Sequence, residues 1–308
     1  MNPADLAVID RLGLTATTTQ VGAKIDRLRH VGVARAHCVF DWDRTLTVPA
    51  SGDDSDPTVW RVLSDLLPEA AREEYRSLFA RFRPAERAGT LSEHQAAHWW
   101  RAVLQIIVRS RVSLADAEHV MASTVALRPG TGRLFRHLTD RRVPRVILSA
   151  GVSDLIEGMC RRNRLQPSGV IATRLATSDG GTITGWDPGS LVHPLNKPAR
   201  AAGDLAQIQR ARPFTILLGD SPTDSAMVQT DEPYGLRICV GSAPPAKAGE
   251  PDEAHQRTLP LFDLTLRGPS LTPVTRLLRY LDLEHQRNPQ RTRQEVASPR
   301  RPPRTRQP

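Results

Sequence analysis

Short apolar runs recur along the chain and alternate with segments whose apolar residues follow helical spacing. Six runs predict strands, at residues 36–40, 143–149, 169–175, 214–219, 236–241 and 261–266. Continuous apolar runs of this length are typical of strands covered on both faces, as in parallel sheets. Because helical segments such as 130–141 and 153–165 separate most of the runs, the pattern predicts an α/β fold with a doubly wound, Rossmann-like and mostly parallel sheet.

Two segments depart from this alternation. Residues 49–128 contain no convincing strand but several amphipathic stretches, which predicts a helical insertion after the first strand. Residues 178–186, "SDGGTITGW", carry the Asp-Gly-Gly signature of a hairpin turn that leads into a short strand. Helical spacing at residues 21–31 places a helix before the first strand.

Composition narrows the class of protein. No apolar run approaches the roughly 20 residues that cross a bilayer, so no membrane association is expected. The first ten residues, "MNPADLAVID", lack the basic and apolar regions of a signal peptide. Three cysteines without CxxC spacing indicate buried thiols in a reducing compartment. We therefore expect a cytoplasmic protein.

The net charge of +9 is concentrated at the carboxyl terminus. Residues 286–308 hold seven arginines and one glutamate, a net charge of +6, so the rest of the chain carries only about +3. This segment has almost no apolar residues, which predicts a disordered tail. It could contact RNA or acidic surfaces weakly, but a solvated tail is the favoured interpretation.

Polar side chains follow several predicted strands at the point where each strand ends. Asp41 and Asp43 follow the first run, Ser149 ends the second, and Asp220 with Asp224 follows residues 214–219. Lys197 ends the loop "HPLNK" that precedes this last run. In open α/β sheets, ligands bind outside the carboxyl ends of the strands, so these groups are expected to share one cleft.

Four carboxylates in one cleft would repel one another unless a cation lay among them. A hard divalent ion with oxygen ligands is the natural partner, and Mg²⁺ also keeps substrate phosphate oxygens in its shell. One carboxylate can attack phosphorus and a second can transfer protons to the leaving group and from water. Hydroxyl, backbone N–H and lysine groups would neutralise the transferring group.

The motifs "DWDRT", "SAG", a lone lysine and "GDSPTD", in this order, resemble the haloacid-dehalogenase-like (HAD) phosphatase superfamily. More narrowly, "VILSAGVSDLIEGMCR", "SDGGTITGWDPGSLVHPLNK" and "TILLGDSPTDSAM" resemble the cytosolic 5'-nucleotidase III, or pyrimidine 5'-nucleotidase, family. The similarity runs from about Val39 to Gly241. It implies a Mg²⁺-dependent phosphomonoesterase that acts on a small phosphoester, with a nucleoside 5'-monophosphate as the favoured substrate.

The resemblance implies the roles of three acids. Asp41 would be the nucleophile and a metal ligand. Asp43 would be the acid/base, with its backbone carbonyl on Mg²⁺, and Asp220 would complete the metal ligands of the protein.

The resemblance also implies a phosphate site. Ser149, the amide of Ala150 and Lys197 would hold the phosphate. Asp224 would orient the lysine or a metal-bound water.

The resemblance finally implies a division into domains. Residues 1–48 and 129–285 would form the core, and residues 49–128 a helical cap that closes over the substrate. Family members read the nucleobase with a cap glutamate, but a rough alignment places Arg81 there, which predicts a different base preference. Trp99 could stack on a base, although packing within the cap is the more common role of such a residue.

Two other functions stay open. The chain could be a HAD phosphatase for a sugar or amino-acid phosphate. Alternatively, it could be a non-catalytic binding protein on a HAD scaffold that uses its basic tail. The pair His94 and His98 has the spacing of zinc ligands on a helix, but it lacks the glutamate of a zinc peptidase and is not expected to bind metal.

Overall fold

The computed structural model describes residues 3–48, 57–228, 234–241 and 258–287. Its centre is a seven-stranded sheet of order β1-β9-β8-β7-β2-β3-β4. β1 pairs antiparallel with β9, and every other neighbouring pair is parallel. The strands are β1 (Leu14–Ala16), β2 (Ala36–Phe40), β3 (Arg145–Val152), β4 (Gly169–Thr173), β7 (Phe214–Gly219), β8 (Gly235–Cys239) and β9 (Leu264–Leu266). The predicted α/β fold with a mostly parallel sheet is confirmed.

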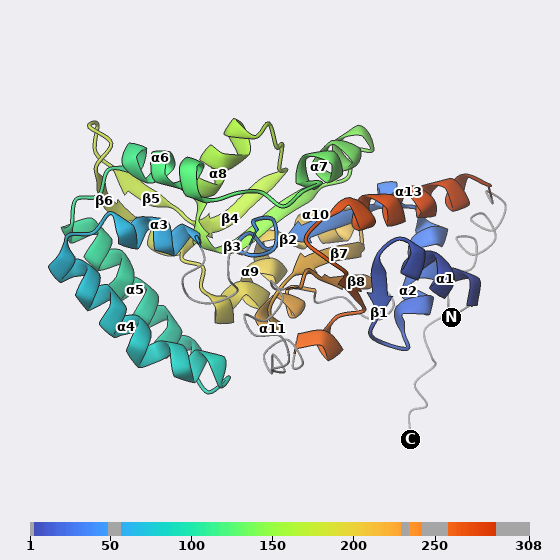
Figure 1. Ribbon diagram of the computed structural model, residues 1–308, viewed down its shortest axis with the longest axis horizontal. Helices are drawn as coiled ribbons and strands as arrows, with labels where there is room; N and C mark the ends of the chain where they lie inside the picture. Colours follow the sequence, from blue (N-terminus) through green and yellow to red (C-terminus); the bar gives the residue numbers. More distant parts are fainter. Residues whose placement is uncertain (1–2, 49–56, 229–233, 242–257, 288–308) are drawn as a thin grey trace, which may run out of the picture.

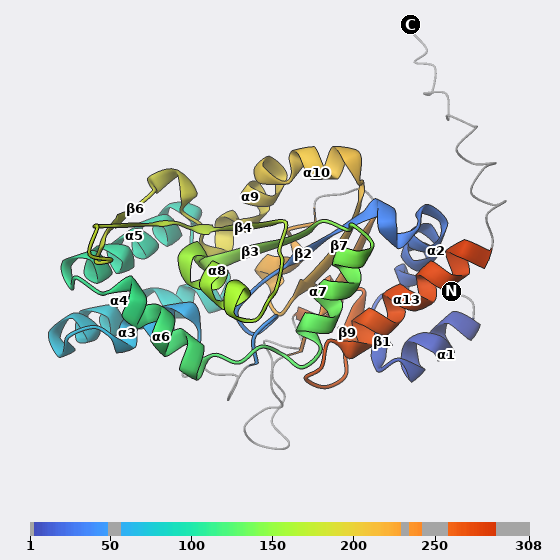
Figure 2. The ribbon, with the colours of Figure 1, turned by 90° about the horizontal axis from the view of Figure 1, so that it is seen from above.

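Helices cover both faces of the sheet (Figure 2). Side chains alternate along each strand, so Cys38 and Phe40 of β2 enter one apolar core and Val39 enters the other. The first core is covered by α2 (Val21–Val31), α7 (Thr131–Asp140), α8 (Ser153–Arg162) and α13 (Thr272–Arg287). The second is covered by α9 (Lys197–Asp204) and α10 (Ala206–Ala211).

Four helices lie between β2 and α7, where the sequence predicts an insertion. They are α3 (Val59–Asp65), α4 (Glu69–Arg87), α5 (Glu93–Arg109) and α6 (Leu114–Thr124). Side-chain caps start three of them, with Thr58 before α3, Ser92 before α5 and Ser113 before α6. α4 and α5 run side by side at one end of the molecule (Figure 1). Within residues 57–128 the structure contains no strand, as predicted.

Several boundaries differ from the prediction. The run 169–175 divides into β4 and the start of the predicted hairpin, which consists of β5 (Leu175–Thr177) and β6 (Ile183–Trp186). The run 261–266 becomes a strand only at Leu264. β1 was not predicted, so the insertion follows the second strand along the chain. The last helix, α13, ends at Arg287, inside the predicted tail, and the rest of that tail lies outside the described residues.

The remaining helical elements are short connections. They are α1 (Pro3–Arg11), α11 (Pro222–Ser225), η1 (Val33–Arg35), η2 (Pro188–Ser190), η3 (Pro194–Asn196) and η4 (Leu259–Leu261). Among the helices that the structure describes, none has the length and apolar character needed to cross a bilayer.

Candidate active site

The site lies where β2, β3 and β7 end at one edge of the sheet. Phe40, the last residue of β2, pairs with Ile147 of β3 and Leu218 of β7, so the residues that follow these two positions extend past the end of β2 at one edge. The backbone N–H of Asp41 then donates to the Leu218 carbonyl at 3.0 Å. This pairing brings residues that are far apart in the sequence to one place, as expected for carboxyl ends of parallel strands.

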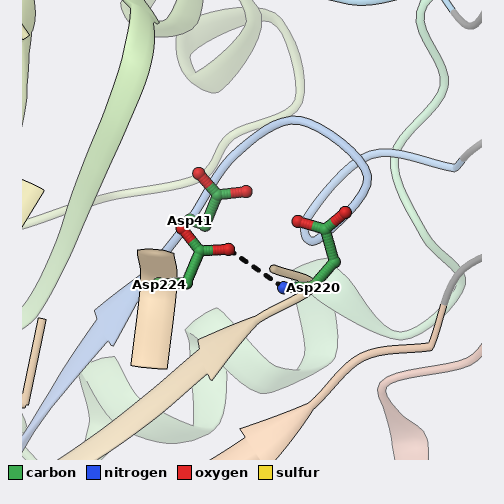
Figure 3. A group of neighbouring side chains, drawn as sticks. All are labelled: Asp41, Asp220 and Asp224. Atoms are coloured by element: carbon green, nitrogen blue, oxygen red, sulfur yellow. Dashed lines mark hydrogen bonds between the residues drawn. The ribbon is translucent and has the colours of Figure 1, made fainter. Parts of the chain in front are cut away.

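Three carboxylates converge there: Asp41 after β2, Asp220 after β7, and Asp224 in α11 (Figure 3). Each offers an oxygen that lies within 4.8 Å of the other two. We call these three residues the acid cluster. Burial raises the pKa of Asp41 to about 6, against the opposing effect of Lys197. Burial and the two neighbouring carboxylates also raise the pKa of Asp220 well above its usual value. Charging the cluster is therefore unfavourable without an added cation.

Lys197 joins two members of the acid cluster. Its Nζ lies 2.6 Å from Asp41 Oδ1 and 2.6 Å from Asp224 Oδ1, and its side chain is buried. Burial lowers the pKa of Lys197, but the two carboxylates outweigh it and the net shift is upward. The lysine is therefore held as a cation between Asp41 and Asp224.

Asp224 is committed to hydrogen bonds on both oxygens. Besides Lys197 on Oδ1, its Oδ2 accepts the backbone N–H groups of Asp220 (3.1 Å) and Ser221 (3.0 Å) and the Ser221 hydroxyl (2.7 Å). By contrast, the Asp220 carboxylate accepts one long hydrogen bond of 3.5 Å, from Thr45, among the described residues. Asp41 and Asp220 consequently retain more capacity to bind a metal ion than Asp224 does.

Gly219 makes the position of Asp224 possible. A Cβ atom at Gly219 would lie 2.4 Å from the Asp224 Cβ, a distance that real side chains do not adopt. The close approach of the β7 end to α11 therefore requires glycine at this position.

Asp43 points toward the inserted helices. Its Oδ1 accepts the backbone N–H of Val59, the first residue of α3, at 3.1 Å. Burial, together with the nearby Asp41, raises the pKa of Asp43 to about 7. Its carboxylate is not part of the acid cluster, and this separation leaves it available for proton transfer.

Ser149 and Ala150 lie inside β3, where its pairing register with β4 shifts between Leu148 and Val152. The Ser149 side chain is buried, and its Oγ accepts the N–H of Gly151 at 3.0 Å. The carbonyl of Ala150 accepts the indole N–H of Trp60 at 2.8 Å. The N–H of Ala150 belongs to the peptide group between Ser149 and Ala150. The hydrogen bonds to Ser149 Oγ and from Trp60 involve the next peptide group, between Ala150 and Gly151.

Arg128 is a buried residue of the site that sequence reasoning missed. Its guanidinium donates to three carbonyls, those of Arg44 (2.5 Å), Gly241 (3.0 Å) and Pro269 (3.3 Å). Arg44 has a φ of 62°, a left-handed conformation that is uncommon outside glycine. Arg128 thus fixes the turn that follows Asp43.

The prediction that Trp99 could stack on a base is wrong in this structure. The Trp99 side chain is 0% exposed, stacked between Phe82 (5.7 Å) and Trp100 (5.0 Å). The alternative, packing among the inserted helices, is what the structure shows. Arg81 is exposed on α4, with its guanidinium 5.1 Å from the centre of the Phe82 ring.

The pair His94 and His98 belongs to no group of three potential metal ligands. Within the described residues, the acid cluster is the one set of three or more His, Cys, Asp or Glu side chains close enough to share an ion.

Solved structures with the same fold are HAD phosphatases. Cytosolic 5'-nucleotidase IIIB, solved with cytidine, superposes with a TM-score of 0.74 at 19% identity, covering 94% of this chain and 100% of that one. A substrate-bound phosphoserine phosphatase gives a TM-score of 0.53 at 14% identity, over 80% and 97% of the two chains. The protein therefore has the HAD fold.

Sequence relatives narrow this class. Residues 45–280 match the pyrimidine 5'-nucleotidase (UMPH-1) family model, and the chain belongs to this family. The 7-methylguanosine phosphate-specific 5'-nucleotidase of Rattus norvegicus is 28% identical over 269 residues, which cover 83% of this chain and 88% of the relative. The protein of the same name from Homo sapiens is 27% identical over 273 residues, with the same coverage. The chain is thus a phosphomonoester hydrolase of the 5'-nucleotidase type.

Proposed function

We propose that this protein is a Mg²⁺-dependent 5'-nucleotidase that hydrolyses nucleoside 5'-monophosphates through an aspartyl-phosphate on Asp41. The observation that carries the proposal is the acid cluster bridged by Lys197. Family membership and the names of the relatives support a nucleotide substrate. The cytoplasmic location remains a prediction. Weak contact of the basic tail with nucleic acid also remains a prediction, since residues 288–308 lie outside the described residues.

Asp41 is the proposed nucleophile. Lys197 holds its Oδ1, so the other carboxylate oxygen is the one that attacks phosphorus while the ester P–O bond breaks. Asp43 gives its proton to the leaving oxygen, and then takes a proton from the water that attacks the aspartyl-phosphate. That second attack releases inorganic phosphate and regenerates Asp41. A pKa of about 7 at Asp43 suits both transfers near neutral pH.

The donor set fits Mg²⁺, which prefers oxygen ligands. Asp41, Asp220 and the backbone carbonyl of Asp43 would hold the ion, and the raised pKa values of the two carboxylates agree with a site built for an added cation. When bound, Mg²⁺ would offset the negative charge of the phosphate and of the nucleophile. Asp224 would keep Lys197 in place without binding the ion directly.

The phosphate is proposed to lie against the Ser149 hydroxyl, the Ala150 N–H and Lys197. The Ser149 Oγ accepts a hydrogen bond from Gly151, so its own O–H is left to donate to a phosphate oxygen. We further propose that residues 49–128 act as a cap over a core of residues 1–48 and 129–285. Arg81 on this cap is proposed to alter base preference.

The test is phosphate release from a panel of nucleoside 5'-monophosphates, sugar phosphates and phosphoserine, with Mg²⁺ and with a chelator. We expect nucleotides to be preferred, chelation to abolish turnover, and Asp41→Asn to be inactive. If a sugar phosphate or phosphoserine is preferred, the nucleotidase proposal is replaced by the alternative of a HAD phosphatase for a sugar or amino-acid phosphate. Absence of turnover, with a biological effect that Asp41→Asn leaves intact, would favour the non-catalytic binding protein. Arg81→Glu should change the order of bases, and an unchanged order removes the proposed role of Arg81.

A further inference from the structure

Trp60 connects the inserted helices to residues 149–151 of β3, which carry the proposed phosphate ligands. It is the second residue of α3 and is 6% exposed, and its Nε1–H donates to the Ala150 carbonyl at 2.8 Å. That carbonyl belongs to the peptide group between Ala150 and Gly151, whose N–H donates to Ser149 Oγ at 3.0 Å. Both polar ends of this one peptide group are therefore held, one by Trp60 and one by Ser149.

The first turn of α3 also fits closely against Gly151. A Cβ atom at Gly151 would lie 3.1 Å from Val59 Cγ2 and 3.2 Å from Ser149 Oγ, which is tighter than ordinary packing. Val59 in turn donates its backbone N–H to Asp43. Two consecutive residues of α3 thus contact groups that follow β2 and groups at the end of β3.

We propose that Trp60 is a positioning residue for phosphate binding, an inference that rests on the proposed function. With its carbonyl held by Trp60, the Ala150–Gly151 peptide keeps its N–H on Ser149 Oγ. That hydrogen bond occupies a lone pair of the hydroxyl and leaves the O–H to donate to phosphate. Without the indole donor the peptide group can rotate, and Ser149 and the neighbouring Ala150 N–H lose their fixed directions.

Trp100 supplies a matched control. Its ring lies 4.6 Å from that of Trp60, and its side chain is 3% exposed. Its indole nitrogen is buried and has no hydrogen-bond partner among the described residues. Trp60→Phe and Trp100→Phe therefore remove similar volumes from one aromatic contact, but only the first removes a hydrogen bond to Ala150.

The experiment compares wild type with these two variants by kcat, KM, the inhibition constant of inorganic phosphate and the midpoint of thermal unfolding. We expect Trp60→Phe to weaken phosphate inhibition and raise KM by about 3- to 10-fold, the effect of one lost hydrogen bond. In Trp100→Phe, KM and the inhibition constant of phosphate should stay within about 2-fold of wild type, whether or not its unfolding midpoint changes. Equal phosphate inhibition in the two variants overturns the proposal.

Two further results keep the test decisive. If Trp60→Phe does not fold, Trp60→Met replaces it, because this flexible apolar side chain also lacks the indole N–H and leaves Gly151 and Ser149 unchanged. An unchanged phosphate inhibition constant in that variant contradicts the inference. Activity of the wild type on nucleotides reports the proposed function alone, whereas the difference between the two phenylalanine variants reports the role of Trp60.

Discussion

Replacing Asp41 by asparagine should stabilise the metal-free protein while abolishing activity. The substitution keeps the shape of the side chain and removes one buried negative charge from the acid cluster. Lys197 keeps its ion pair with Asp224 at 2.6 Å, so the variant does not leave a buried cation without a partner. The direction of the effect follows from the raised pKa of Asp41, because burial outweighs the attraction of Lys197.

The magnitude follows from the difference between the folded and unfolded pKa values. A rise from 3.8 to about 6 corresponds to roughly 3 kcal/mol of lost stability once the folded carboxyl has ionised. Below about pH 3 the carboxyl is protonated in both the folded and the unfolded state, and wild type and variant should be equally stable. As the pH rises, the carboxyl of the unfolded chain loses its proton first. The free energy of unfolding of wild type therefore decreases relative to that of the variant until the pH exceeds the pKa of the folded state.

Calorimetric unfolding of both proteins across this pH range, in a chelator, measures the effect. At neutral pH the variant should unfold roughly 6 °C above wild type, and the gap should close toward acid pH. Added Mg²⁺ should raise the midpoint of wild type, since it binds only the folded state, and should raise that of the variant much less. Asp204→Asn, which alters a surface pair with Arg200, should shift the midpoint little at any pH.

A variant less stable than wild type at neutral pH in the chelator would refute this reasoning. It would show that the attraction between Lys197 and Asp41 exceeds the unfavourable burial of the charge. A stability gap independent of pH would refute it as well, because the effect would then come from packing and not from ionisation.

Three other substitutions have expected outcomes. Gly219→Ala should displace Asp224, reduce kcat at least tenfold and lower the free energy of unfolding by about 2 kcal/mol or more. The control is Gly203→Ala, since Gly203 is a helical glycine with open space around its Cβ position. This variant should keep wild-type activity and be as stable as wild type or more stable. Lys197→Arg should lose most activity, because the planar guanidinium cannot occupy a point 2.6 Å from two carboxylates as an ammonium does; phosphate release measures this. Arg128→Met should destabilise the fold by about 3 kcal/mol in urea unfolding and lower kcat, since three carbonyls lose a buried donor.

The position of the site was predictable because its signal is local. Asp41 and Asp220 each follow directly after an apolar run, and parallel strands bring their carboxyl ends to one edge. The contact between Lys197 and the acid cluster confirms that the lysine loop reaches the same edge. The chemical roles of these residues remain proposals, since position alone does not establish them.

The parts that escaped prediction depend on contacts between distant residues. β1 has three residues, too few to show the alternation of apolar and polar positions that predicts a strand. It forms because Leu14 pairs with Leu266, which is distant in the sequence. Trp60 meets Ala150 across 90 positions of sequence, and no local pattern indicates this hydrogen bond. Arg128 is one of thirty-nine arginines, a residue type that is rarely buried.

Charge balance links these observations to the proposed chemistry. The acid cluster and Asp43 together contribute four negative charges when ionised. Lys197 contributes one positive charge, and Arg44 and Arg128 contribute two more, since each interacts electrostatically with Asp220. One negative charge then remains, and a bound divalent cation would turn it into a net positive charge facing the phosphate. Burial raises the pKa values of these carboxyls, and the neighbouring carboxylates raise them further. Without a metal ion, protons therefore balance part of the negative charge, and binding Mg²⁺ should release them.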